Sequence, residues 1–265
     1  KMKIIFTVLG FFFVSSIMAQ SIASIAYYKV PREEAAQFIR SHQKFTDLSS
    51  SDDRLLRGGG VFAHVHAENY TYVSYDFYDS VSDLEKDGSI AAAALKKNVD
   101  ALKLSKKEKE ALTKEYRKYN RTIYYNHYDQ IRMANPEMSW NFQTADWTKK
   151  KITTLSKFKI KDGMQDQFFD AWKKGEYKNK QESGFVEAIT GSWHLYGEGD
   201  HIHVYTFFDS WDNFASFEKA SSYDVAKDMG ENEKKFWSTV ETHEDEILMF
   251  IGGINQTTGK FYFAK

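Results

Sequence analysis

The sequence has no cysteine and only two prolines among its 265 residues. Without cysteine the chain can form no disulfide, no thiolate metal site and no cysteine nucleophile. Net charge is also nearly absent, because 36 basic side chains oppose 37 acidic ones and leave a formal charge of -1. A chain with so little net charge creates no overall field for a polyanion, so we expect no nucleic-acid partner.

Long hydrophobic runs are absent except near the N-terminus. Lys1 and Lys3 form a short basic start, residues 4–14 are apolar, and residues 15–20 are mostly small, with a plausible cleavage point after Ala19. The apolar run is shorter than the ~20 residues of a typical membrane span, and this order is that of a signal peptide. We therefore expect residues 1–20 to be a bacterial signal peptide and the mature protein to be secreted or periplasmic, without membrane contact. An uncleaved anchor is the alternative.

One stretch of the sequence occurs twice. Residues 61–80, VFAHVHAENYTYVSYDFYDS, recur without a gap at residues 191–210, GSWHLYGEGDHIHVYTFFDS. Equivalent positions differ by 130 throughout, as in His64 with His194, Tyr75 with Tyr205, and Phe77 with Phe207. A repeat of this length indicates a duplicated domain rather than a solenoid.

Both copies have the same predicted order of elements. The first has a strand at 22–30, a helix opened by Pro31, a hairpin at 61–78, helices near 80 and at 106–119, and a strand at 122–133. The second has a strand at 151–160, a helix from Gly163 capped by Asp162, the repeated hairpin, helices at 211–220 and 231–243, a strand at 246–251 and a short edge strand at the C-terminus. This order, β-α-β-β-α-β, is typical of a four-stranded antiparallel sheet with helices on one face. We predict a first unit at 21–133, a linker at 134–150 and a second unit at 151–265.

Two short motifs lie at the predicted junctions. Gly58, Gly59 and Gly60 are expected to break the chain before the second strand. Asp79-Ser80 and its equivalent Asp209-Ser210 are expected to cap the helix that follows each hairpin.

Two such units, with aromatic strands that are apolar on both faces, resemble the dimeric α/β-barrel superfamily. That superfamily includes antibiotic-biosynthesis monooxygenase-like, stress-responsive and chlorite dismutase-like proteins. The resemblance implies an α+β chain in which two tandem ferredoxin-like units pack their antiparallel sheets as an intrachain pseudo-dimeric α/β barrel. It also implies two chemistries, since some members bind haem and others oxidise small aromatic substrates without a cofactor. A fold with so many activities assigns none of them by itself.

Histidines and tyrosines in the two hairpins are the candidate ligand-binding residues. Strand alternation places His64 and His66 on one face, and His201, His203 and Tyr205 on one face of a later strand. The full candidate set is His64, His66, His194, Tyr196, His201, His203 and Tyr205. An imidazole here could be an axial haem ligand, a base or hydrogen-bond donor, or a structural group bonded to a neighbour. No carboxylate at matching spacing completes a metal site, so we expect none.

These observations favour an exported soluble protein that binds a small apolar or aromatic ligand in a barrel pocket. The alternatives are a monooxygenase-like or haem-binding enzyme, and a structural or interaction protein without a pocket. The second copy has more bulky and titratable groups in its hairpin, with Trp193 and His203 where the first has Ala63 and Val73. We therefore expect any pocket in the second copy, between its sheet and helices. The sequence does not fix whether the chain forms oligomers.

Overall fold

The computed structural model describes residues 21–66, 70–221 and 230–265. The first unit contains β1 (Ile22–Tyr28), α1 (Ala35–Leu48), β2 (Gly58–His66), β3 (Tyr72–Tyr78), α2 (Val81–Ala101), α3 (Lys106–Tyr125) and β4 (His127–Trp140). The second contains β5 (Lys151–Ile160), α4 (Gln165–Trp172), a π-helical segment η1 (Lys173–Tyr177), α5 (Lys178–Glu182), β6 (Ala188–Tyr196), β7 (Ile202–Phe208), α6 (Trp211–Ser221), α7 (Glu231–Thr239) and β8 (Val240–Ile254). A short strand, β9 (Phe261–Phe263), follows. No helix in the described ranges is both long and apolar enough to cross a membrane.

Strand pairing confirms the repeat of 130 residues. Phe62 lies opposite Val73 between β2 and β3, and Ser192 lies opposite His203 between β6 and β7. Ile25 lies opposite Tyr75, as Leu155 lies opposite Tyr205. The two units therefore share one register as well as one order of elements.

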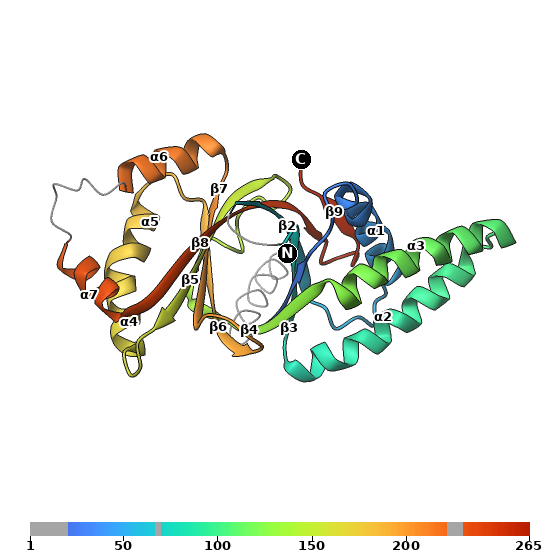
Figure 1. The fold of residues 1–265 in the computed structure, drawn as a ribbon, viewed down its shortest axis with the longest axis horizontal. Helices are drawn as coiled ribbons and strands as arrows, with labels where there is room; N and C mark the ends of the chain where they lie inside the picture. Colours follow the sequence, from blue (N-terminus) through green and yellow to red (C-terminus); the bar gives the residue numbers. More distant parts are fainter. Residues whose placement is uncertain (1–20, 67–69, 222–229) are drawn as a thin grey trace, which may run out of the picture.

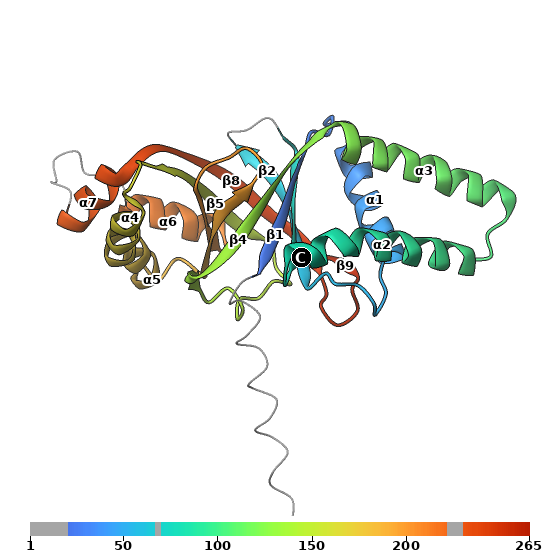
Figure 2. The ribbon, with the colours of Figure 1, turned by 90° about the horizontal axis from the view of Figure 1, so that it is seen from below.

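The two sheets join at both edges into a closed barrel. The strand order is β2-β3-β1-β4-β6-β7-β5-β8-β9, and β2 also pairs with β8, so eight strands close and β9 adds to the outside edge. The seams between units are the β4–β6 and β2–β8 pairings. Helices α1, α2 and α3 lie on one side of the strands and α4 to α7 on the other (Figure 1). The second view shows the same arrangement (Figure 2). The predicted pseudo-dimeric α/β barrel is confirmed, and closure leaves few unpaired strand edges.

Glycines allow close approach at the β2–β8 seam. Gly60 lies opposite Gly253 and Val61 opposite Gly252. A Cβ atom on Gly59 would lie 2.7 Å from the carbonyl oxygen of Tyr75, and one on Gly252 would lie 2.2 Å from a backbone oxygen of β9. The expectation that Gly58, Gly59 and Gly60 break the chain is therefore wrong. They begin β2, and at Gly59 and Gly252 only glycine fits between neighbouring strands.

Alternation along the strands separates the barrel interior from the helix layers. In β7 the side chains of Ile202, Val204 and Phe208 pack toward the helices, whereas Tyr205 and Phe207 pack in the barrel. Every residue of β7 is buried, because both faces of this strand are covered. The strand is mostly apolar, as a sheet between two packed layers requires, and its buried polar residues include His203 and Thr206.

The segment between the units differs from the predicted linker. Residues 134–140 belong to β4, in which Pro136 lies at a break in the β4–β6 register and so removes no ladder hydrogen bond. Residues 141–150 then cover one end of the barrel. There the Trp147 ring packs edge-on against Phe207, with ring centroids 4.9 Å apart, and against Phe250, at 5.2 Å. The connection is thus part of the core rather than a free tether.

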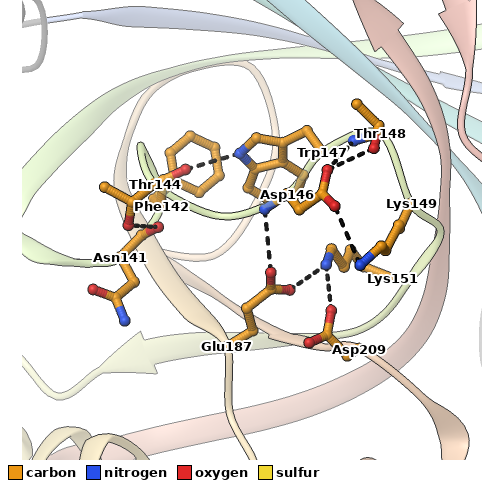
Figure 3. A network of polar contacts seen from close by, with 10 residues as sticks. All are labelled: Asn141, Phe142, Thr144, Asp146, Trp147, Thr148, Lys149, Lys151, Glu187 and Asp209. Carbon is orange, nitrogen blue, oxygen red and sulfur yellow. Dashed lines mark hydrogen bonds and ion pairs between the residues drawn. The ribbon is translucent and has the colours of Figure 1, made fainter.

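Polar contacts fix this segment to the second unit (Figure 3). The backbone N–H of Asp146 donates to Glu187 at 3.2 Å, and the Lys151 ammonium pairs with Glu187 at 2.5 Å and with Asp209. Lys265 adds backbone hydrogen bonds to Thr148 and Lys150. The segment is therefore bound by both the second unit and the C-terminal end of the chain.

Serines cap the helices after each hairpin, as predicted, but the aspartates before them do not. Ser80 accepts from the N–H of Asp83, and Ser210 accepts from the N–H of Asn213, both at 3.1 Å. Asp79 instead pairs with Arg57 at 2.5 Å, as Asp209 does with Lys151. Asp162 does not cap α4 either, since its N-cap residue is Met164 without a side-chain hydrogen bond.

Candidate functional site

One half of the barrel interior is polar. Along β7 the inward side chains run from Phe207, which contacts Trp147, through Tyr205 to His203. Beyond Tyr205 the interior changes from phenylalanines to a set of buried phenols and charged groups, here called the polar cluster. Its members are Tyr27, Tyr70, Tyr75, Arg132, Lys157, His203, Tyr205 and Glu246, each at most 7% exposed.

Tyr75 and Tyr205, which are equivalent in the repeat, meet at the centre of the cluster. The Tyr75 hydroxyl donates to the Tyr205 hydroxyl, and the Tyr205 hydroxyl lies 3.2 Å from Nδ1 of His203. Burial raises the pKa of both phenols. Burial, and then the charges of Arg132 and Lys157, lower the pKa of His203, so the imidazole is neutral at pH 7.

Arg132 of β4 is a fully buried cation. Its guanidinium donates to the Ser192 hydroxyl at 3.0 Å, to Gln130 at 3.3 Å, and to the backbone oxygens of Ser192, Asp200 and His201 at 3.1–3.2 Å. These five bonds use all the N–H donors of the guanidinium. Arg132 thereby joins β4 to the β6–β7 hairpin, and none of its hydrogen-bond acceptors is a carboxylate.

The other charged members of the cluster form a pair. Lys157 of β5 is ion-paired with Glu246 of β8, and Glu246 also accepts from the Tyr70 hydroxyl. Tyr70 in turn packs edge-on against Tyr27, with ring centroids 4.9 Å apart. A buried pair of this kind is costly to break, because either charge left alone stays away from water.

A second feature is a shallow groove on the outer side of the second unit, between β4, β6 and α4. Its volume is about 390 Å3, and it is lined by Met133, Ala134, Asn135, Pro136, Glu137, Phe169 and Trp193. The Phe169 and Trp193 rings stack with centroids 4.9 Å apart and planes at 29°. We call it the Trp193 groove. None of the seven predicted ligand-binding residues lines it.

A larger hollow, of about 750 Å3, runs along α3 and has a different character. Its lining includes Lys106, Lys109, Lys114 and Arg117, with Leu104 as the one apolar member. Such a face is a solvated, charged helix surface rather than a site for an apolar ligand.

Solved structures resemble this chain over most of its length. An anthrone oxidase-like protein is 12% identical, with 88% of this chain and 92% of that chain covered and a TM-score of 0.59. A proposed monooxygenase from Fusobacterium nucleatum is 8% identical, with 92% and 98% covered and a TM-score of 0.57. Another, from Lactobacillus acidophilus, is 12% identical, with 93% and 100% covered and a TM-score of 0.53. The chain has the dimeric α/β-barrel fold. At these identities the likeness concerns the fold alone.

Sequence comparisons add nothing to this assignment, since no protein-family profile and no curated protein sequence matches the chain.

The dimeric α/β-barrel fold distributes the predicted site residues over several environments. His203 and Tyr205 point into the barrel and meet each other. His194 lies at the rim, where its Nε2 is 2.7 Å from the backbone oxygen of Gly197, and Tyr196 is 60% exposed. The candidates of the second copy are therefore divided between the barrel interior and its rim.

The remaining candidates lie at the same end of the barrel. Nδ1 of His201 accepts from the N–H of Ile160 at 3.0 Å, so this ring closes the end of β5. The His64 ring lies 4.7 Å from that of Tyr70. The side chain of His66 lies outside the described residues.

Arg132, Lys157 and Glu246 were missed by the sequence analysis. Their strands also carry exposed charged residues, such as Asp129, Lys159 and Glu244, so nothing in the sequence marked these three as buried. Phe169 was assigned correctly to a helix, but nothing in its spacing indicated that it would stack on Trp193.

Haem does not fit the described side chains of this dimeric α/β barrel. Neither hollow is lined by a histidine. The space between the second sheet and its helices is filled by Phe158, Phe168, Trp172 and Phe236, each at most 5% exposed. In the described ranges, no group of three or more His, Asp or Glu side chains is placed to hold a metal ion.

Proposed function

We propose that the chain is an exported binding protein that holds a small aromatic molecule in the Trp193 groove. One observation carries the proposal: Phe169 and Trp193 form a stacked aromatic pair in a groove that Met133 and Pro136 extend with apolar surface. Its volume of about 390 Å3 falls within the roughly 300–1,000 Å3 of small-molecule sites. Asn135 and Glu137 at the edge can fix the orientation of a polar substituent.

The direct test is titration with 5-fluoroindole, followed by 19F NMR. We expect a dissociation constant of about 1 mM or tighter, which corresponds to about -4 kcal/mol. Trp193→Ala should weaken binding about tenfold or more, because it removes one of the two stacking rings. Trp211→Ala is the matched control, since Trp211 is 45% exposed on α6 and does not line the groove. Equal affinity in both variants, or no binding by the wild type, would favour a structural or interaction role without a ligand.

Export is a separate part of this proposal and needs its own test. Residues 1–20 have the basic, apolar and small order of a signal peptide. N-terminal sequencing of protein recovered from a bacterial host should give a first residue near Gln20 or Ser21. A chain that retains residues 2–19 would favour an uncleaved anchor instead.

Oxidation of a bound aromatic is the second candidate function. The fold neighbours that are described as anthrone oxidase-like or as monooxygenases favour it. The model reaction is the oxidation of an anthrone by O2, which gives the anthraquinone and water. Glu137 is the titratable side chain that lines the groove, and it is ion-paired with Lys173. The absorbance of 1,8-dihydroxyanthrone should then change faster than in buffer, and Glu137→Gln should slow it without weakening 5-fluoroindole binding. A rate equal to that in buffer would exclude oxidation and leave binding as the proposed function.

A further inference from the structure

Besides Oε1 of Glu246, which is ion-paired with Lys157, two buried polar groups in the polar cluster have no hydrogen-bond partner. They are the Tyr27 hydroxyl and Nε2 of His203, and both residues are 0% exposed. Buried polar atoms of this kind are rare in folded proteins, since each costs the free energy of its lost hydration. Two of them at one end of one barrel indicate that something occupies the space between them.

Both groups act as hydrogen-bond donors. The Tyr75 hydroxyl donates to the Tyr205 oxygen, which leaves the Tyr205 proton for Nδ1 of His203. A neutral imidazole that accepts at Nδ1 has its proton at Nε2, so the unpartnered atom is an N–H group. Tyr27 packs edge-on against Tyr70, whose hydroxyl donates to Glu246, and Glu246 pairs with Lys157, which lies opposite His203 between β5 and β7. The two donors, from β1 and β7, therefore belong to one connected cluster.

Charge at this end of the barrel is positive. Arg132 and Lys157 are buried cations, and Glu246 is the buried carboxylate that pairs with Lys157. Arg132 makes no ion pair with a described side chain, although Asp200 at the mouth acts on it at longer range. A buried cation without a paired anion is unfavourable in a protein interior.

We propose that a single small anion of the size of chloride binds inside the barrel, between the Tyr27 hydroxyl and Nε2–H of His203 and beside Arg132. The anion accepts from both donors and balances the guanidinium charge. Its size follows from the packing, because Tyr75 and Tyr205, with ring centroids 5.2 Å apart, fill the space toward Trp147. A water molecule fits less well, since it would leave the buried Arg132 charge without an anion.

Thermal unfolding in two salts tests the proposal in solution. Sodium chloride should raise the Tm above its value in sodium gluconate at equal ionic strength, because gluconate is too large for the packed interior. At a chloride concentration ten times the dissociation constant, the rise should be about 3 °C or more. Equal Tm values in the two salts would overturn the proposal.

Tyr27→Phe and Tyr28→Phe form a matched pair on one strand. Tyr27→Phe removes an unpartnered donor and should abolish the chloride dependence while leaving the Tm in gluconate unchanged or higher. Tyr28 faces the helix layer, where its hydroxyl lies 3.2 Å from that of Ser74. Tyr28→Phe should lower the Tm in both salts and keep the chloride dependence. A chloride dependence that survives Tyr27→Phe would place the anion elsewhere and contradict the site.

Diffraction from a crystal soaked in sodium bromide locates the ion. An anomalous peak within hydrogen-bond distance of the Tyr27 oxygen and of His203 Nε2 is expected. An empty site, or a water molecule in the same place, would refute the assignment. A bromide peak without any chloride effect on the Tm would mean an adventitious ion only and would also overturn it.

Discussion

The helix layers of the two units differ in their buried polar contacts, although their strands share one register. In the first unit aromatic packing around Phe38 is combined with polar contacts, such as His42 with the Tyr119 hydroxyl at 2.9 Å and the ion pair of Arg54 with Asp87 at 2.6 Å. In the second unit the layer is a packed aromatic cluster that includes Phe158, Phe168, Trp172, Phe208 and Phe236. Duplication has therefore kept the strands and allowed the layers to change.

The difference shows which constraints the two units share. Strand positions are shared because each sheet supplies half of one interior and both seams, so a slip in either would turn side chains out of the barrel. A helix layer covers only its own sheet. In the first unit α2 and α3, of 21 and 20 residues, extend away from the barrel, whereas α4, η1 and α5 follow the second sheet (Figure 1).

The largest expected effect is in the aromatic layer of the second unit. Phe236 is fully buried, with its ring 5.0 Å from that of Phe168 and 5.5 Å from that of Phe158. Phe236→Ala should lower the free energy of unfolding by about 3–5 kcal/mol, since it removes a large ring and leaves a cavity. Urea denaturation measures the loss. Tyr125→Ala is the control, because Tyr125 is 80% exposed, and it should change stability by less than about 0.5 kcal/mol.

The helix layer of the first unit should respond to loss of a charge. Arg54 donates from Nε and from one NH2 group to the two oxygens of Asp87, at 2.8 and 2.6 Å, and Asp87 is 2% exposed. Arg54→Leu leaves this carboxylate buried without its cation and should cost about 3 kcal/mol. Arg54→Leu combined with Asp87→Leu should recover part of the loss, measured by the same denaturation. A single variant as stable as the wild type would show that the layer does not depend on this pair.

The two layers should also differ in their response to acid. Burial lowers the pKa of His42 from its usual 6.5 to about 4. The unfolded chain then binds this proton more readily than the folded one, so stability is complete above pH 6.5 and falls as the pH drops toward 4. Because the ring is partly exposed, we expect a loss of up to about 2 kcal/mol. His42→Gln should remove this part of the acid loss, and a variant with the same pH profile as the wild type would contradict the assignment.

The smallest effect is expected where the two units meet. Tyr75→Phe removes the donor to Tyr205 and should cost about 1 kcal/mol. Tyr205→Phe should cost more, because it deprives both Tyr75 and His203 of a partner. A double-mutant cycle of these changes measures the coupling between the hydroxyls. Equal losses of stability from Tyr75→Phe and Tyr205→Phe would mean that the two equivalent hydroxyls still contribute equally to stability.

The repeat made most of the fold predictable. An ungapped offset of 130 residues fixes equivalent strands, and alternating buried positions fix their faces, so element order and duplication follow from the sequence. The packing of the two sheets was implied by the resemblance to the dimeric α/β-barrel superfamily. The boundaries of β4 were harder to predict, because a proline such as Pro136 normally ends a strand. Here it lies at a break in the β4–β6 pairing. The three glycines of β2 were misassigned for a similar reason, since their role depends on Gly252 and Gly253 of a distant strand.

The candidate site was predicted only in part. Strand alternation correctly joined His203 and Tyr205, whose positions are two residues apart on one strand. The contact of Tyr75 with Tyr205 joins residues 130 apart, and that of Lys157 with Glu246 joins β5 to β8. The Phe169 and Trp193 pair joins α4 to β6. Such pairings depend on how helices and strands cross in space, which no local spacing encodes.

Fusion of the two halves by residues 141–150 has an evolutionary consequence. A barrel assembled from two identical subunits must present each interior substitution twice, once on either side of its twofold axis. Here the strand partners show that Arg132 occupies the position that Leu248 has in the other half, since each lies opposite a histidine of the repeated hairpin. A second arginine at Leu248 would place two like charges in one interior. A single polypeptide can acquire one such cation, and one imidazole beside it, without acquiring its mirror copy.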